Sequence, residues 1–190
     1  LPGFQKRYPD IELELCCDDR FVDLVAEGFD VAIRIASALG DTTLIARTLT
    51  VSKRVLVASP AYIHTHGLPR TAQELDEHRL LRFVGEASDW QLTSARGATV
   101  SVTPKGQFKT NTITALHAAT LAGAGIGCFT HATVRNNLAQ GQLVPILPNY
   151  SMGEWRYYAL YPQSRHLAPK VRAFVDYMAD FYQVDAKAAV

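Results

Sequence analysis

The stretch LAGAGIGCF (Leu121–Phe129) has three glycines at alternate positions, and the elements around it decide what kind of fold the sequence encodes. A dinucleotide-binding fingerprint places its glycines between a strand and a helix, so that free N–H groups at the helix N-terminus face the pyrophosphate. Here the order is reversed, because a helical pattern capped by Asn111 or Thr112 precedes the glycines and the apolar run IGCF (126–129) follows them. We therefore predict a helix C-cap at Gly123 and close packing of helix against strand.

The first forty residues predict a βαβ unit. The run IELELCC (11–17) alternates apolar and acidic residues like a strand with one wet face, and DDRFVDLVAEG (18–28) follows as a helix capped by Asp18 or Asp19. The nearly continuous apolar run FDVAIRIA (29–36) is typical of a strand in a parallel sheet covered on both faces. The fold class is therefore expected to be α/β, with a right-handed crossover.

The rest of the chain alternates between strand-like and helix-like segments. In order, we expect two strand-like runs within 43–59, a short helix from Ala61, a capped helix from Thr71 and a strand over 80–83. A hairpin that turns near Arg96 and Gly97 follows, with a third strand-like run over 107–110 and then the helix and strand described above. The chain ends with a helix closed by Gly141, a strand over 154–162 and a C-terminal amphipathic helix over 169–183. Such an order favours a mixed α/β protein without internal repeats.

Two of these strands, RVLVAS (54–59) and YYALYP (157–162), lie where the texture of the sequence changes. We expect them to cross between two lobes, as in a Venus-flytrap binding protein. Lobe I then comprises 1–57 plus 161–190, and lobe II comprises 58–160.

Composition favours a folded protein that binds nucleic acid poorly by itself. The 190 residues are 48% hydrophobic and 19% charged, and the net charge is only +1, so a strong positive surface is absent. The three cysteines, Cys16, Cys17 and Cys128, form no C-x-x-C pair, and no histidine lies at metal-ligand spacing from them. A reducing cytoplasm is the simplest expectation, and no metal or cofactor is expected.

Several separated segments then match one family in order. YPDIELEL, DRFVDLVAEGFDVAIRI, RVLVASPAYIHTHGLPRTAQELDEHRLL, TNTITALHAATLAGAGIG, LAQGQLVPILPNY and YALYPQSRHLAPKVRAFVDYM closely resemble the effector-binding domain of LysR-type transcriptional regulators. The resemblance implies a two-lobed fold like that of periplasmic binding proteins, with a small-molecule effector in the cleft and side-by-side homodimers. It also implies a preceding winged helix-turn-helix domain and linker helix, which this sequence lacks together with the first strand and the start of the first helix of the effector domain.

The resemblance assigns effector contacts by position. They are Cys17, Asp18, Arg34, Ile35, Ala36, Ser59, Asn111, Thr112, Phe129 and Thr130. Cys17 departs from the hydroxyl residue often found there, which puts a polar contact at that position in doubt. No catalytic residue is assigned.

Each contact also has a plain structural interpretation. Asp18, Asn111 and Thr130 are good helix caps, although uncapped N–H groups at the same helix ends bind carboxylates. Arg34 lies inside an apolar run, so its guanidinium needs either an acidic partner or a ligand. Phe129 lines an apolar pocket or belongs to the core, as does Trp90.

The remaining polar residues do not suggest catalysis. The six histidines are scattered, and neither G-x-S-x-G nor H-E-x-x-H occurs. The sequence thus predicts a cytoplasmic sensor module that is not an enzyme and that binds an anionic or aromatic effector. It would act as a homodimer, or as a tetramer when full-length, and contact DNA only through the missing domain. The alternative is a solute-binding protein of the same fold.

Overall fold

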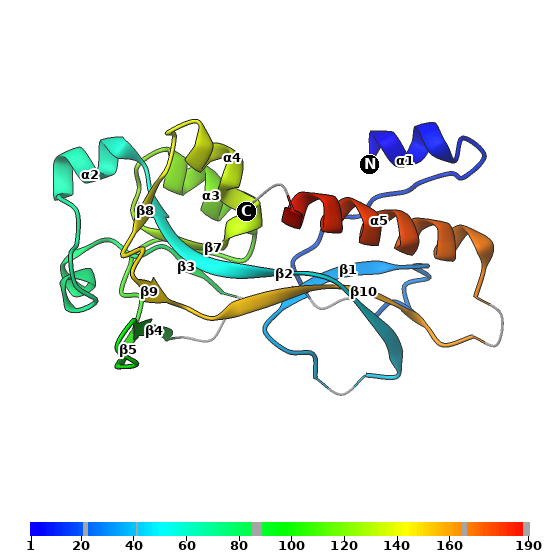
Figure 1. Cartoon of the computed structure of the whole chain (residues 1–190), viewed down its shortest axis with the longest axis horizontal. Helices are drawn as coiled ribbons and strands as arrows, with labels where there is room; N and C mark the ends of the chain where they lie inside the picture. Colours follow the sequence, from blue (N-terminus) through cyan, green and yellow to red (C-terminus); the bar gives the residue numbers. More distant parts are fainter. Residues whose placement is uncertain (21–22, 41, 85–88, 165–166, 188–190) are drawn as a thin grey trace. The chain divides into compact units, whose positions relative to one another are not determined.

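The computed structural model describes residues 1–190 except 21–22, 41, 85–88, 165–166 and 188–190. The chain divides into two compact units, which are Leu1–Val51 with Trp155–Val190 (unit 1) and Ser52–Glu154 (unit 2). It leaves unit 1 inside the long strand β2 (Leu44–Ala58) and returns at the start of β10 (Glu154–Pro162). These two predicted crossover strands are confirmed as neighbours in a sheet of order β1-β10-β2-β7, in which β8 also pairs with β2 (Figure 1).

Unit 1 is a small sheet covered by the C-terminal helix. Strand β1 (Ala32–Ala36) runs antiparallel to β10, with Ala32 opposite Leu160 and Ala36 opposite Arg156. Helix α5 (Pro169–Lys187) lies along this sheet, and α1 (Pro2–Arg7) lies on the outer side of α5 (Figure 1). The expected amphipathic character of α5 is confirmed, because it buries Val171, Val175 and Met178, and α1 buries Phe4.

The predicted parallel βαβ unit is wrong. Residues 11–19 have no regular secondary structure and pair with no described strand, and most of their side chains are exposed, so the alternating pattern alone did not produce a strand. Residues 24–28 form turns instead of a helix: the carboxylate of the preceding Asp23 accepts from the amides of Val25 and Ala26, and Gly28 has φ 75°. Phe21 and Val22, which were expected on that helix, lie outside the described residues.

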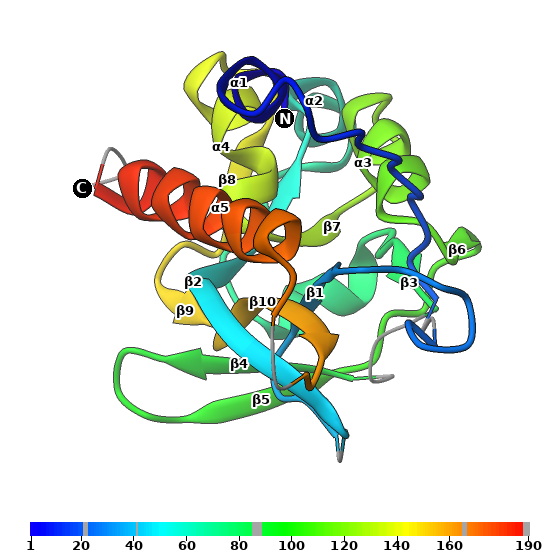
Figure 2. The same ribbon diagram turned by 90° about the vertical axis from the view of Figure 1, so that its right-hand side faces the viewer.

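Unit 2 contains the remaining helices and strands. In chain order these are α2 (Pro60–His66), the 3-10 helix η1 (Gln73–Glu77), β3 (Arg82–Phe83), β4 (Trp90–Ser94), β5 (Thr99–Val102), β6 (Lys109–Thr110), α3 (Ile113–Leu121), β7 (Gly127–Thr130), α4 (His131–Ala139), β8 (Val144–Ile146) and β9 (Tyr150–Ser151). The predicted hairpin is confirmed, since β4 and β5 pair antiparallel and Gly97 has φ 83° in the turn (Figure 2). Two other predictions need correction, because the runs within 43–59 form one strand and the helix after Thr71 is a short 3-10 turn.

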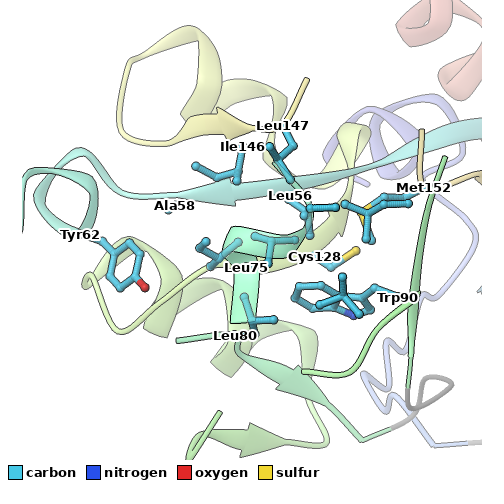
Figure 3. Packing of buried hydrophobic residues seen from close by; sticks show 14 residues of the cluster. Leu56, Ala58, Tyr62, Leu75, Leu80, Trp90, Cys128, Ile146, Leu147 and Met152 are labelled. Atoms are coloured by element: carbon cyan, nitrogen blue, oxygen red, sulfur yellow. The ribbon is translucent and has the colours of Figure 1, made fainter. Parts of the chain in front are cut away.

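Strand β2 separates two apolar clusters in unit 2, because successive side chains leave opposite faces of a strand. Leu56 and Ala58 belong to a cluster with Trp90, Leu92 and other residues of the β4–β5 side (Figure 3). Val55 and Val57 belong instead to a cluster with residues of α3 and α4. The continuous apolar run in β2 is therefore explained by burial on both faces.

The glycines that follow α3 have the structural role predicted for them. Gly123 has φ 81° and follows the last turn of α3, a backbone conformation that other residues rarely adopt. At Gly127 a Cβ atom would lie 2.5 Å from both the Thr120 Oγ1 atom and the Phe129 ring. The order helix, glycines, strand is confirmed, and it serves close packing of α3 on β7.

Candidate functional site

Three of the residues near the start of unit 1 form a chain of polar contacts. The Arg20 side chain donates to both oxygens of the Asp18 carboxylate at 2.6–3.2 Å, and the Arg20 carbonyl oxygen accepts a hydrogen bond of 3.0 Å from the Arg34 guanidinium. The hydrogen bonds from Arg20 hold the pKa of the Asp18 carboxyl below its ordinary value. Asp18 therefore does not cap a helix here; it accepts from Arg20 in a local turn.

The candidates on β1 differ in the direction of their side chains. Arg34 and Ala36 are two residues apart and share one face of the strand, whereas Ile35 leaves the opposite face and is 38% exposed. Arg34 is half-buried, and its contact with the Arg20 carbonyl meets part of the hydrogen-bonding demand of a guanidinium in an apolar strand. Cys17 is exposed, next to Asp18. A ligand on the Arg34 side of β1 would therefore meet the backbone of Ile35 and not its side chain.

In unit 2, the N-termini of α3 and α4 are satisfied in different ways. The Thr112 hydroxyl accepts from the Ala115 amide at 3.3 Å and caps α3, with exposed Asn111 just before it. Thr130 occupies the N-cap position of α4, but its hydroxyl is 2.8 Å from the Thr133 hydroxyl and makes no cap bond. A side chain at the start of unit 2 caps α4 instead.

That cap is Ser52, the first residue of unit 2. Its side chain is buried within β2, and its hydroxyl oxygen accepts from the Ala132 amide at 3.1 Å. Sequence reasoning missed Ser52, because the two residues are 80 positions apart and a capping serine is usually recognised next to its own helix. The alternation of polar and apolar residues before Arg54 gave no such signal, because Ser52 is buried while Val51 is 44% exposed.

Both helix N-termini lie at the same end of β7. Helix α3 runs antiparallel to this strand, since Thr120 packs against Gly127 near the start of β7 while the His117 and Phe129 rings meet edge to face at 5.8 Å. The start of α3 therefore points toward the end of β7, where α4 begins. Each terminus carries a partial positive charge, so this end of unit 2 is suited to an anion.

Ser59 is not part of this group. It caps α2 by accepting from the Tyr62 amide at 3.3 Å, and its hydroxyl is 3.4 Å from the place of a Cβ atom on Gly123. Gly123 follows the C-terminus of α3, whose nine residues span about 13 Å. The structure thus places Ser59 at the opposite end of α3 from Thr112.

The aromatic candidates are buried in the apolar clusters of unit 2. Phe129 is 3% exposed in the cluster of α3 and α4, and Trp90 is 3% exposed in the cluster of β4 and β5. A pocket of about 120 Å³ opens beside the second cluster, between Arg54, Leu92 and the segment 145–152. None of the predicted effector contacts lines it.

Potential metal ligands are scattered in the described part of the chain. No three His, Cys, Asp or Glu side chains gather there in a way that suits a metal ion, and His166 lies outside the described residues. Among the described helices, none combines the length and the apolar character needed to cross a membrane.

Comparisons with known proteins place this geometry in a family. The family model described as LysR substrate binding domain matches residues 1–183. The chain is 31% identical over 180 residues to the HTH-type transcriptional regulator CrgA of Neisseria meningitidis (serogroup C, strain 8013), covering 93% of this chain and 59% of CrgA. It is also 31% identical over 178 residues to the HTH-type transcriptional activator AaeR of Escherichia coli K12, covering 93% of this chain and 57% of AaeR.

A solved structure agrees with these relatives. The regulatory domain of CrgA from N. meningitidis superposes with a TM-score of 0.84 at 30% identity, over 95% of this chain and 89% of that domain. The relatives named here are transcriptional regulators, which agrees with the expectation of a non-enzymatic regulator and does not favour a solute-binding protein. The chain spans less than two thirds of the length of the curated relatives it matches. It has the two-lobed, periplasmic-binding-protein-like α/β fold, and it belongs to the family of LysR substrate binding domains.

Proposed function

We propose that this chain is the effector-sensing part of a cytoplasmic LysR-type transcriptional regulator, in which a small molecule bound between two lobes controls DNA binding by a separate winged helix-turn-helix domain. The family match over residues 1–183 carries this proposal. The weak net charge of +1 supports a division of labour in which another domain contacts DNA. In the cell the chain forms side-by-side homodimers, and the full-length protein forms tetramers.

The effector is proposed to be a small anionic or aromatic compound. Three features support an anion: the half-buried Arg34 guanidinium, the N-terminus of α3 at Asn111 and Thr112, and the N-terminus of α4 at Thr130. The proposed contacts remain Cys17, Asp18, Arg34, Ile35, Ala36, Ser59, Asn111, Thr112, Phe129 and Thr130. Among them, Arg34, Thr112 and Thr130 have the strongest support from local geometry, whereas Ser59 and Phe129 have structural roles that explain them without a ligand.

The proposal requires that the effector bind one arrangement of the protein more tightly than another. A ligand with equal affinity for both arrangements would not change the equilibrium between them. Calorimetric titration with a panel of aromatic and aliphatic carboxylates, combined with small-angle scattering of the dimer, tests it. We expect at least one compound to bind and to change the shape of the dimer. Binding without a change in shape would contradict the switching role.

Two variants locate the site in the same experiment. Arg34→Gln should weaken binding of a carboxylate about tenfold or more, since a charge-assisted hydrogen bond is worth about 1.5–3 kcal/mol. Arg96→Gln is the matched control, because Arg96 is exposed in the turn between β4 and β5. Equal affinities for the two variants would remove Arg34 from the proposed site.

A further inference from the structure

A buried tyrosine in unit 2 contacts two histidines, one through its ring and one through its hydroxyl. Tyr62 of α2 is 1% exposed and lies at one end of an apolar cluster, away from Trp90 and Met152 (Figure 3). Its hydroxyl is 3.1 Å from Nδ1 of His78, which follows η1. The His66 ring stacks on the Tyr62 ring, with 4.4 Å between centroids and 13° between planes.

Two groups form hydrogen bonds with the Tyr62 hydroxyl. The Arg79 amide donates to the hydroxyl oxygen at 2.9 Å, and we assign the hydroxyl proton to the bond with Nδ1 of His78, so that the hydroxyl both accepts and donates. This arrangement requires a neutral His78 that carries its proton on Nε2. Protonation at Nδ1 would turn His78 into a second donor toward the same oxygen and leave the hydroxyl proton without this acceptor.

The groups around His78 shift its pKa in opposite directions. The Nδ1 atom of His66 is 3.2 Å from the Tyr62 carbonyl oxygen, which requires a proton on that nitrogen. Repulsion from His66 lowers the pKa of His78, whereas Glu74 and Glu77 of η1 attract a positive charge there and raise it. Burial is the largest influence and repulsion from His66 adds to it, so the pKa of His78 lies below its ordinary value of 6.5.

We propose that the contact of Tyr62 with His78 is an acid-sensitive latch, which joins α2 to the end of η1 at neutral pH and loosens when His78 is protonated. A lowered pKa in the folded state means that the stabilisation is complete above about pH 6.5 and is lost as the pH falls toward the folded-state pKa. Protonation of His78 is sufficient to loosen this latch, and no other ligand is required. Loosening of α2 also reaches Ser59, because the Ser59 hydroxyl accepts from the Tyr62 amide.

Amide hydrogen exchange at Arg79 reports on the latch directly. We expect the protection factor of this amide to be constant above about pH 6.5 and to fall about tenfold for each pH unit down to the His78 pKa, where it levels off. His78→Gln keeps a hydrogen-bond acceptor without a titrating ring, so its protection factor should not change with pH. His64→Gln, on the exposed side of the same helix, is the control and should behave as the wild type.

The pKa of His78 in the wild-type chain provides a second test, which requires no substitution. The His78 ring, followed by NMR in the wild-type chain, should titrate below 6.5. A His78 pKa at or above 6.5, or the same loss of protection in His78→Gln as in the wild type, would overturn the proposal. If His78→Gln does not fold, the ring titration of the wild type and its Arg79 protection factors decide the question by themselves.

Discussion

Gly125 passes so close to Arg79 that a Cβ atom at position 125 would lie 2.2 Å from the Arg79 carbonyl oxygen. The same oxygen accepts a hydrogen bond of 2.8 Å from the Ile126 amide, and Leu80 forms a parallel bridge with Ile126. Backbone therefore meets backbone at this point of unit 2. A side chain on residue 125 can be accommodated only if this pairing moves.

We predict that Gly125→Ala lowers the free energy of unfolding by about 1–3 kcal/mol, because an added methyl group in a packed interior forces backbone shifts. Urea denaturation followed by circular dichroism measures the change. Gly40→Ala is the control, since a Cβ atom there would meet nothing within 4 Å, and its effect should stay within about 0.5 kcal/mol. Equal stabilities for the two variants would show that the close approach is tolerated.

In unit 1, the Phe4 ring holds α1 against α5. Phe4 is fully buried and meets the Phe174 and Tyr177 rings edge to face, at 5.3 and 5.4 Å between centroids. We predict that Phe4→Ala lowers the free energy of unfolding by about 3–5 kcal/mol through lost burial and the cavity left behind. In thermal denaturation, Phe4→Ala should have a lower melting temperature than Leu1→Ala, because Leu1→Ala removes a side chain that is already 37% exposed. A melting temperature shared by Phe4→Ala and Leu1→Ala would contradict the role of Phe4.

The hydrogen bond from the Ala132 amide to Ser52 gives a third prediction. Ser52→Ala should lower the free energy of unfolding by about 0.5–2 kcal/mol, as expected for a lost helix cap, and should raise amide exchange at Ala132. Ser37→Ala changes an exposed serine of unit 1 and should alter neither quantity. Unchanged exchange at Ala132 in Ser52→Ala would show that another group satisfies this amide.

The pair of Asp18 and Arg20 gives a prediction about pH. Hydrogen bonds from Arg20 lower the Asp18 pKa, so Arg20→Gln should raise it toward the ordinary value of 3.8. A lowered carboxyl pKa stabilises the fold above pH 3.8, and this contribution is lost as the pH falls through the folded-state value. NMR titration of the Asp18 carboxyl measures the change, with Arg96→Gln as the control. An Asp18 pKa that is the same in wild type and Arg20→Gln would assign the shift to another cause.

Local signals predicted much of unit 2. Thr112 caps α3, Gly123 ends it, and Gly97 turns the hairpin of β4 and β5, all from residues adjacent to the elements they bound. Ser52 shows the limit of such reasoning for the site, since it caps a helix 80 residues away. The position of Ser59 relative to Thr112 was likewise invisible, because it depends on how α2 meets the C-terminal end of α3.

By itself, the sequence determined the family, the two crossover strands, both ends of α3 and the C-terminal end of α4, because caps, left-handed glycines and apolar periodicity act within one turn or one strand. Tertiary structure alone decided that β1 pairs antiparallel with β10 and that residues 11–19 pair with no described strand. A strand exists only where another backbone supplies its hydrogen bonds, and an alternating pattern does not specify that partner. The same dependence on distant partners decided which polar residues stand together at the helix N-termini.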